Sequence, residues 1–343
     1  MFTVTNEDIA VVLRDFSLPA ELISFTELQR YHYEQDDPDS KQVRLIVKAV
    51  TGGRSFVLRF KNEEDAPQEI IEAQSRFAAM LYGHGIETPK AYTSDGKYTR
   101  LYTINGYDVV VTAEDFMDGE IREVDPATAM DTGALLAKMH CAAENADAHV
   151  DSEVLFDPLS DNDLFFYDAF ERRRERLTAV NGALYDSIAR KHEELLSRVE
   201  TLADEPKYAV QGDISDCNLY RTKDGTVGVF DFNRCGDNRL FFDAVMQAVF
   251  EARLMDYPAD LEGRQEEIIL SSFLKGYQQV RPFTARQKEV FPYLYALIDA
   301  FWGEDMSWSD RSPKTTFDEA DDASVEQWMK DIYKRETDLK HTL

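Results

Sequence analysis

Apolar and polar residues alternate over much of the first 115 residues with the period of two that is typical of strands. Residues 66–82 interrupt this pattern with apolar side chains at helical spacing, and Gly83 and Gly85 follow. A shorter helical pattern at residues 6–16 predicts an N-terminal helix that serves as a lid or spacer. We therefore expect a small antiparallel sheet with one accompanying helix. The β-prone runs that predict its strands are residues 23–33, 42–50, 55–60, 90–92, 101–104 and 109–112.

Helical periodicity dominates the chain after residue 115. Two β-prone runs, residues 219–221 and 227–230, flank a turn that contains Gly225 and predict a hairpin. The sequence therefore predicts an α+β protein in two parts, residues 1–115 and residues 116–343. The helical patterns of the second part lie at residues 128–146, 166–177, 184–202, 240–252, 268–277, 286–301 and 324–339.

The composition indicates a folded, cytoplasmic protein. Of its 343 residues, 43% are hydrophobic and 12% are aromatic, which excludes a disordered or fibrous chain. No apolar run approaches the roughly 18 residues of a membrane span, and the first residues lack a signal-peptide pattern. Cys141, Cys217 and Cys235 include no CxxC pair, so we expect free thiols rather than disulfides or a zinc site.

The charge balance narrows the choice of partners. Lys and Arg total 38 against 65 Asp and Glu, a net charge of −27. This charge repels phosphate backbones and anionic lipid surfaces, so we expect neither nucleic acid nor membrane as a partner. The same charge would favour a cationic substrate, although a solvated acidic surface explains it equally well.

The stretch from Gln211 to Asp231 carries the candidate chemistry. The predicted hairpin holds Asn218 at one end and Asp231 at the other, so an amide oxygen and a carboxylate converge. Such hard oxygen ligands suit Mg²⁺, whose coordination substrate phosphates usually complete. Asp213, five residues before the amide, would then face a hydroxyl group.

These residues resemble the signatures of a known superfamily. Gln211-Gly212-Asp213-x-x-x-x-Asn218, followed by Val229-Phe230-Asp231-Phe232-Asn233, resembles the H-G-D-x-x-x-x-N and I-D-F motifs of aminoglycoside phosphotransferases and choline kinases. The resemblance implies a two-lobe, protein-kinase-like fold with ATP between the lobes. It also implies that Asp213 is the base or orienter of the acceptor hydroxyl and that Asn218 and Asp231 bind Mg²⁺. The γ-phosphate would pass to a hydroxyl of a small molecule, of aminoglycoside or amino-alcohol type.

The resemblance also assigns nucleotide-binding residues in the first part. Arg59 falls at the position of the lysine that contacts phosphates in this superfamily, and Lys61, on the same face of the strand, is the second choice. The helix at residues 66–82 should supply a carboxylate that pairs with this cation. Glu72 is the preferred residue, with Glu69 as the alternative.

Two further regions are placed by the resemblance. Glu114 and Phe116 mark the hinge, where backbone groups would bind the adenine base. Residues 155–168 precede the catalytic loop, where the superfamily builds its acceptor pocket. Its candidate lining residues are Asp161, Asp163, Phe165 and Phe166.

Arg59 and a first loop without glycine leave other functions open. A pseudokinase or nucleotide-binding regulator is one alternative, and the presence of Asp213, Asn218 and Asp231 argues against it. A kinase that acts on a protein hydroxyl is another. A metal-dependent hydrolase is weaker, because no histidine cluster is visible.

Overall fold

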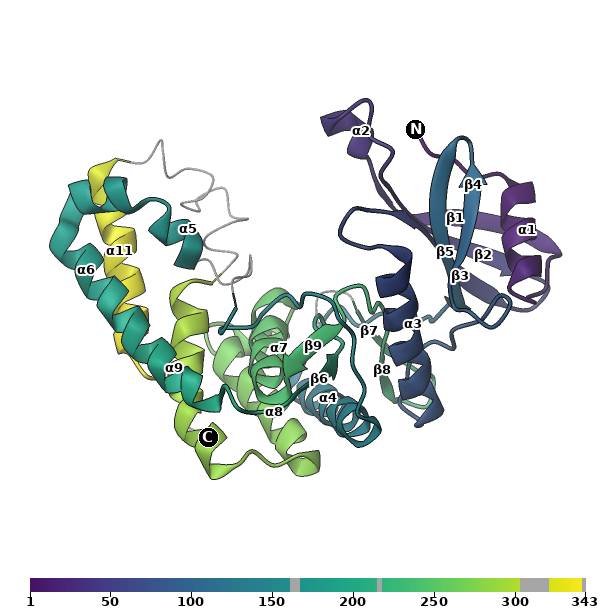
Figure 1. The fold of residues 1–343 in the computed structure, drawn as a ribbon. Coiled ribbons are helices and arrows are strands. Elements are labelled where there is room, and N and C mark those ends of the chain that lie inside the picture. The colour runs from purple at the N-terminus through teal and green to yellow at the C-terminus, as the bar shows by residue number, and fades with distance from the viewer. Residues whose placement is uncertain (161–166, 215–217, 303–320, 341–343) are drawn as a thin grey trace.

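The computed structural model describes residues 1–160, 167–214, 218–302 and 321–340. Figure 1 shows two lobes, an N-terminal lobe built on a sheet and a larger, mainly helical C-terminal lobe. The two-lobe α+β class predicted from the sequence is confirmed. The division at residues 115 and 116 stays a prediction, although the last strand of the sheet ends at Asp115.

Five antiparallel strands form the N-terminal sheet, in the spatial order β1-β2-β3-β5-β4. In β2 and β3, which lie inside the sheet, every residue is buried or half-buried. Residues 90–92 do not form the expected strand, since Ala91 makes only an isolated bridge to Glu114. The strands are β1 (Leu22–Tyr31), β2 (Val43–Thr51), β3 (Ser55–Asn62), β4 (Arg100–Ile104) and β5 (Tyr107–Asp115).

Helix α1 (Asn6–Asp15) packs against the sheet of the N-terminal lobe. Its side chains Ile9, Val12 and Leu13 are fully buried and share a hydrophobic cluster with residues of β2, β3 and β5. Thr5 and Asp8 form a capping box that fixes its start. The lid or spacer role expected for this helix is therefore wrong, because its apolar stripe completes the core of the lobe.

Helix α3 (Gln68–Gly83) lies between the sheet and the C-terminal lobe (Figure 1). Its buried Phe77 and Leu81 belong to the large core of the C-terminal lobe, whereas the sheet and α1 have a separate core. A short helix that the sequence did not suggest, α2 (Tyr33–Asp36), follows β1. Helix α3 therefore packs as part of the C-terminal lobe while it borders the sheet.

The C-terminal lobe consists of helices around two small two-stranded sheets, β6 with β9 and β7 with β8. One expected helix is divided, because residues 166–177 contribute to both α5 and α6. The helices are α4 (Pro126–Ala146), α5 (Tyr167–Glu171), α6 (Arg174–Val199), α7 (Leu240–Leu254), α8 (Gln265–Val280), α9 (Ala285–Ala300) and α11 (Asp322–Thr337). The strands are β6 (Lys207–Val210), β7 (Leu219–Arg221), β8 (Val227–Val229) and β9 (Gly236–Arg239).

A buried polar contact ties α4, α7 and α8 together. His140 is 1% exposed, and its ring nitrogens contact the Tyr277 hydroxyl at 2.8 Å and the Asp243 carboxylate at 3.0 Å. His140 is thus a satisfied core residue. In the described part of the chain, no helix is long and apolar enough to span a bilayer. Cys141 and Cys235 are free thiols, and Cys217 lies outside the described residues.

Candidate active site

The loop between β6 and β7 carries Asp213, and a glycine permits its path. Gly212 has φ of +79°, and a Cβ added there would lie 2.6 Å from the carbonyl oxygen of Arg234. The backbone before Asp213 therefore packs directly on the segment that follows Asp231. A side chain at position 212 would separate the two segments.

Two glutamines brace this loop from either side. Gln211 Nε2 donates to the carbonyl oxygens of Asp213 and Asp231, at 3.0 and 2.6 Å, and its Oε1 accepts from the Asp213 N–H at 2.8 Å. Gln247 Oε1, on α7, accepts from the Ile214 N–H at 2.8 Å. Gln211 replaces the histidine of the motif that the sequence resembles, and its amide links Asp213 to Asp231 with both its donor and its acceptor.

The β7–β8 hairpin brings Asn218 and Asp231 to one place. Leu219 pairs with Val229, and the Phe230 N–H donates to the Asn218 carbonyl oxygen at 3.0 Å. Asn218 Nδ2 donates to the Asp213 carbonyl oxygen at 2.7 Å, so its Oδ1 is the atom left for a cation. The residues that the sequence predicted as base and metal ligands therefore lie together.

Arg59 lies in β3 with its guanidinium between two carboxylates. It donates to Glu114 on β5, and its Nη2 is 3.9 Å from Asp231 Oδ2. Burial opposes the charge of Arg59, but the carboxylates outweigh it and raise its pKa. Burial raises the pKa of Glu114, and Arg59 opposes that shift. Glu114, predicted only as a marker of the hinge, is thus the partner of the strand cation.

Lys61 points to the same side of β3 as Arg59 but binds a neutral group. It is 4% exposed, and its ammonium donates to the Asn233 side-chain oxygen. Burial lowers the pKa of Lys61 to about 8, and the nearby Asp231 carboxylate opposes the shift. Both basic residues that the sequence offered for phosphate binding therefore reach the surroundings of Asp231.

The predicted pairing of Glu72 with the strand cation is wrong. The Glu72 carboxylate accepts from the backbone N–H and the hydroxyl of Thr99, both at 2.9 Å, and from Arg76 at 2.9 Å. The residue of α3 that faces the site is Gln74, which is 6% exposed. The sequence did not single out Gln74, because the expected partner of the strand cation was a carboxylate. The helical spacing could have indicated it, since Gln74 lies on the same helical face as the buried Ile71, Phe77 and Ala78.

A cavity of about 260 Å³ lies between the lobes and is called here the interlobe cavity. Arg59, Glu114, Phe116, Asn218 and Asp231 line it, which brings most of the predicted site residues together. The Phe116 N–H already donates to the Ser55 carbonyl oxygen, so a base would use other backbone groups there. Besides Phe116, the apolar lining consists of Leu28, Ile46, Val57, Pro89, Met117 and Phe230.

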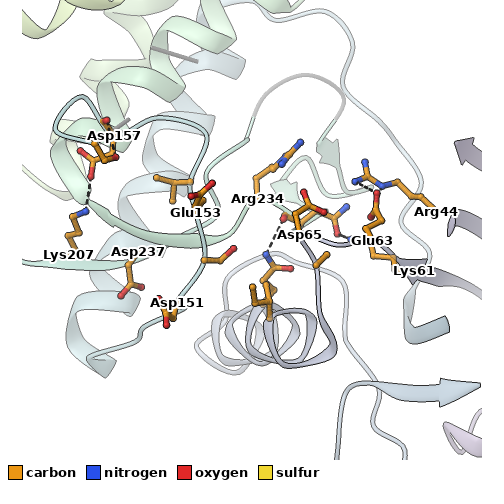
Figure 2. A pocket seen from close by; sticks show the side chains of 17 residues that line it. Arg44, Lys61, Glu63, Asp65, Asp151, Glu153, Asp157, Lys207, Arg234 and Asp237 are labelled. Carbon is orange, nitrogen blue, oxygen red and sulfur yellow. Dashed lines mark hydrogen bonds and ion pairs between the residues drawn. The ribbon is translucent and has the colours of Figure 1, made fainter. Parts of the chain in front are cut away.

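A second cavity, of about 650 Å³, is called the charged cavity (Figure 2). Lys61, Asn233 and Arg234 on its wall place it beside the segment that follows Asp231. The acceptor-pocket residues expected at positions 161–166 lie outside the described residues. The charged cavity is also lined by the cations Arg44 and Lys207 and by the carboxylates Glu63, Asp65, Asp151, Glu153, Asp157 and Asp237.

The residues present fit a magnesium nucleotide. Asn218 and Asp231 offer hard oxygen atoms, and the Arg59 Nε is buried with no hydrogen-bond partner in the described chain. The described residues contain no group of three His, Cys, Asp or Glu side chains that could hold a metal. Ligands from the nucleotide phosphates would complete a Mg²⁺ site with only two protein side chains.

Comparison with known proteins identifies the class. The fold is that of a kinase-like phosphotransferase. The profile of the phosphotransferase enzyme family (APH) matches residues 40–283, so the chain belongs to this family. Members of this class act on hydroxyl groups of small molecules. No curated protein sequence matches the chain significantly.

Solved structures share the fold at low sequence identity. Amicoumacin kinase hAmiN, in complex with AMP-PNP, Ca²⁺ and Ami, is 15% identical with a TM-score of 0.56, covering 96% of this chain and 94% of that chain. A microcompartment-associated aminopropanol kinase is 14% identical with a TM-score of 0.57, covering 95% and 94%. Spectinomycin phosphotransferase APH(9)-Ia, in complex with ADP and spectinomycin, is 11% identical with a TM-score of 0.52, covering 99% of both chains.

Proposed function

We propose that this protein transfers the γ-phosphate of Mg²⁺-bound ATP to a hydroxyl group of a cationic small molecule. The observation that carries the proposal is the convergence of Asn218 and Asp231 with Arg59 around the interlobe cavity, beside the loop of Asp213. Asn218, Asp231 and Arg59 would hold the nucleotide, and Asp213 would act on the acceptor.

Each residue has a distinct role in this reaction. Asp213 orients the acceptor hydroxyl and takes its proton, a role that typically contributes about 10²- to 10⁴-fold. Asn218 and Asp231 hold Mg²⁺, which when bound neutralises phosphate charge. Arg59, fixed by Glu114, contacts phosphate oxygens, and Glu114 and Phe116 border the base. The apolar lining of the interlobe cavity excludes water from the base.

The charged cavity is assigned to the acceptor. Several of its charges neutralise one another, since Arg44 pairs with Glu63 at 2.6 Å and Lys207 pairs with Asp157 at 2.7 Å. The exposed Asp65, Asp151, Glu153 and Arg234 form no ion pair with any described residue. Three available carboxylates against two cations, Arg234 and Lys61, favour an acceptor with ammonium groups, such as an amino alcohol or an aminoglycoside. An aminopropanol kinase among the similar structures agrees with this.

The test is nucleotide binding and turnover with purified protein. Calorimetry should show far tighter ATP binding with Mg²⁺ than with EDTA. ATP consumption should rise with amino alcohols or aminoglycosides and not with neutral polyols of similar size. Equal ATP affinity in EDTA, together with no acceptor-dependent turnover, would favour a nucleotide-binding regulator. Turnover only in the presence of a protein substrate would favour a protein kinase.

A further inference from the structure

Strand β3 presents two buried cations with different partners. Arg59 is 9% exposed and pairs with the Glu114 carboxylate, whereas Lys61 is 4% exposed and donates to the amide oxygen of Asn233. A carboxylate in contact cancels most of the charge of Arg59. The charge of Lys61 is not cancelled in this way, because an amide oxygen carries only a partial charge.

The two cations also face different cavities. Arg59 lines the interlobe cavity, and Lys61 lines the charged cavity. A small cavity of about 40 Å³ is lined by both residues and by Gln74 and Asn233. Lys61 therefore lies on the side of Arg59 toward the proposed acceptor, and the nearby Asp231 carboxylate acts on its charge.

Helix α3 fixes the partner of Lys61 through an amide. Gln74 Nε2 donates to the carbonyl oxygens of Asn233 and Cys235, at 3.0 and 3.1 Å. These bonds hold the backbone that carries Asn233, and Asn233 in turn holds the Lys61 ammonium. The chain of contacts from α3 to β3 is thus made of hydrogen bonds without an ion pair.

We propose that Lys61 is a second phosphate-binding cation, which contacts the γ-phosphoryl group as it passes to the acceptor, and that Asn233 and Gln74 position it. This proposal rests on the proposed function. In the transfer the acceptor oxygen forms a bond to the γ-phosphorus, and the bond from that phosphorus to the β,γ-bridging oxygen breaks. ADP keeps the electron pair of the broken bond, and the hydroxyl proton passes to Asp213.

The division of labour follows from the charges. Phosphoryl transfer is accelerated mainly by fixed charges aimed at the oxygens of the transferred group. Arg59, near Asp231 and Glu114, is placed for phosphates that remain on the nucleotide. Lys61 lies beside the acceptor cavity, and no carboxylate of the described residues contacts it, so it is placed for the phosphate that leaves.

The experiment compares Mg²⁺-bound AMP-PNP with Mg²⁺-bound ADP by calorimetry, which requires no acceptor. Lys61→Met should weaken AMP-PNP binding by about tenfold or more, the usual range for a lost hydrogen bond to a charged group, and change ADP binding little. Arg59→Met should weaken both nucleotides. Lys275→Met, an exposed lysine of α8, is the charge-matched control and should alter neither affinity.

Variants of the positioning residues separate placement from folding. Asn233→Leu and Gln74→Leu should lower the preference for AMP-PNP over ADP. Asn233→Asp, which keeps an oxygen for Lys61 but cancels its charge, should lower it as well. If Lys61→Met abolishes ADP binding as well, the same measurements are made with Lys61→Gln. If Lys61→Gln also binds neither AMP-PNP nor ADP, Lys61 is a structural residue and the proposal is overturned.

An unchanged AMP-PNP to ADP ratio in Lys61→Met also overturns the proposal and leaves the phosphotransferase function intact. A parent protein that binds neither nucleotide contradicts the proposed function itself.

Discussion

The charge on Arg59 is fixed within the sheet. Glu114 lies opposite Val57 in the β3–β5 pairing, and Val57 is two residues before Arg59 on the same face. The ion pair therefore joins neighbouring strands and does not depend on the position of α3. The sequence placed Arg59 in β3 correctly, but Glu114 emerged as its partner only from strand register, which local patterns do not specify.

At the same scale, Asp213 and Asp231 should respond differently to the same substitution. Asp213→Asn loses the negative charge that takes the proton, so turnover should fall by about 10²- to 10⁴-fold while Mg²⁺-ATP affinity changes little. Asp231→Asn should instead damage Mg²⁺-dependent nucleotide binding. The turnover number and the Mg²⁺-ATP affinity are measured for both variants, with an acceptor identified by the turnover test. Near-parental turnover of Asp213→Asn would remove its catalytic assignment.

Helix α3 shows what can be predicted at the scale of an element. Its existence and its apolar stripe followed from periodicity, and it begins and ends within two residues of the expected bounds. Glu72 and Gln74 are two residues apart and so point to widely different sides of the helix. Which of them faces the site depends on how the helix is rotated about its axis in the tertiary structure. Periodicity does not specify this rotation, so the prediction of Glu72 was wrong.

Helices α4 and α8 cross at two glycines. A Cβ added to Gly133 would lie 2.0 Å from the Phe273 carbonyl oxygen, and one added to Gly276 would lie 1.9 Å from that of Met130. These approaches bring backbone against backbone, so no side-chain movement can relieve a larger residue. The sequence offered two isolated glycines in helical patterns, but not that they face each other.

Gly133→Ala should therefore destabilise the C-terminal lobe. Overpacking costs up to about 3 kcal/mol, or more against backbone, and the better helix propensity of alanine returns about 1 kcal/mol. We expect the free energy of unfolding, from chemical denaturation followed by circular dichroism, to fall by about 2 kcal/mol. Gly83→Ala at the end of α3, with nothing within 4 Å of the added Cβ, is the matched control. Equal stability of the two variants would contradict the tight crossing.

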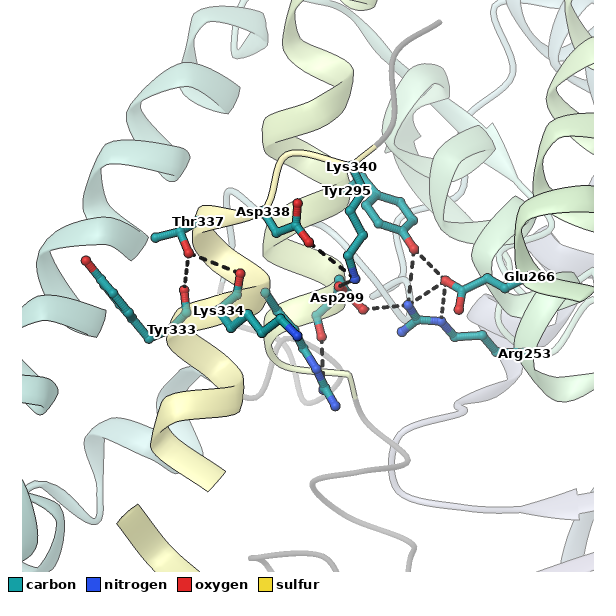
Figure 3. A network of polar contacts seen from close by, with 10 residues as sticks. Arg253, Glu266, Tyr295, Asp299, Tyr333, Lys334, Thr337, Asp338 and Lys340 are labelled. Carbon is teal, nitrogen blue, oxygen red and sulfur yellow. Dashed lines mark hydrogen bonds and ion pairs between the residues drawn. The ribbon is translucent and has the colours of Figure 1, made fainter. Parts of the chain in front are cut away.

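At the scale of the whole molecule, an ion-pair network joins four elements of the C-terminal lobe (Figure 3). Arg253 on α7 pairs with Glu266 on α8 and with Asp299 on α9, both at 2.6 Å. Arg335 on α11 donates to the Asp299 carbonyl oxygen at 3.3 Å, and Lys340 lies 3.8 Å from the Asp299 carboxylate. The final helix is thereby attached to the core that carries the loop of Asp213.

The whole-molecule architecture was largely predictable, and the cavities were not. A single motif from Gln211 to Asp231 indicated the two-lobe class, since a fixed spacing of functional residues reflects one fold. The charged cavity instead combines Arg44 from β2, Gln74 from α3, Glu153 from an irregular stretch and Lys207 from β6. Such a surface depends on how distant segments pack, which composition and periodicity do not encode.

The packing of α11 on α6 buries a carboxyl group that can be tested by pH. Glu336 on α11 is fully buried, and neither carboxyl oxygen has a hydrogen-bond partner in the described part of the chain. Burial raises its pKa to about 9, with Lys191 opposing the shift. His192 on α6 lies 4.0 Å away, and burial lowers its pKa to about 3. The ring of Tyr167 stacks on the ring of His192, with 3.6 Å between the two ring centroids.

Glu336 should make stability depend on pH, and Glu336→Gln should remove that dependence. Because its folded pKa is raised, its contribution is fully present below the unfolded value near 4.5 and is lost as pH rises to about 9. The lowered pKa of His192 affects stability only below about pH 6.5. Between pH 6.5 and 8.5 the parent should therefore lose about 1.4 kcal/mol more per pH unit than the variant.

Denaturant unfolding of both proteins at several pH values in this range measures the difference. Glu193→Gln, an exposed glutamate next to His192 on α6, should keep the parental slope. Identical slopes for the parent and Glu336→Gln, with the variant less stable throughout, would instead mean that Glu336 is ionised and paired with His192. That result would require a charged His192 in the folded protein and would make the contact between α6 and α11 an ion pair.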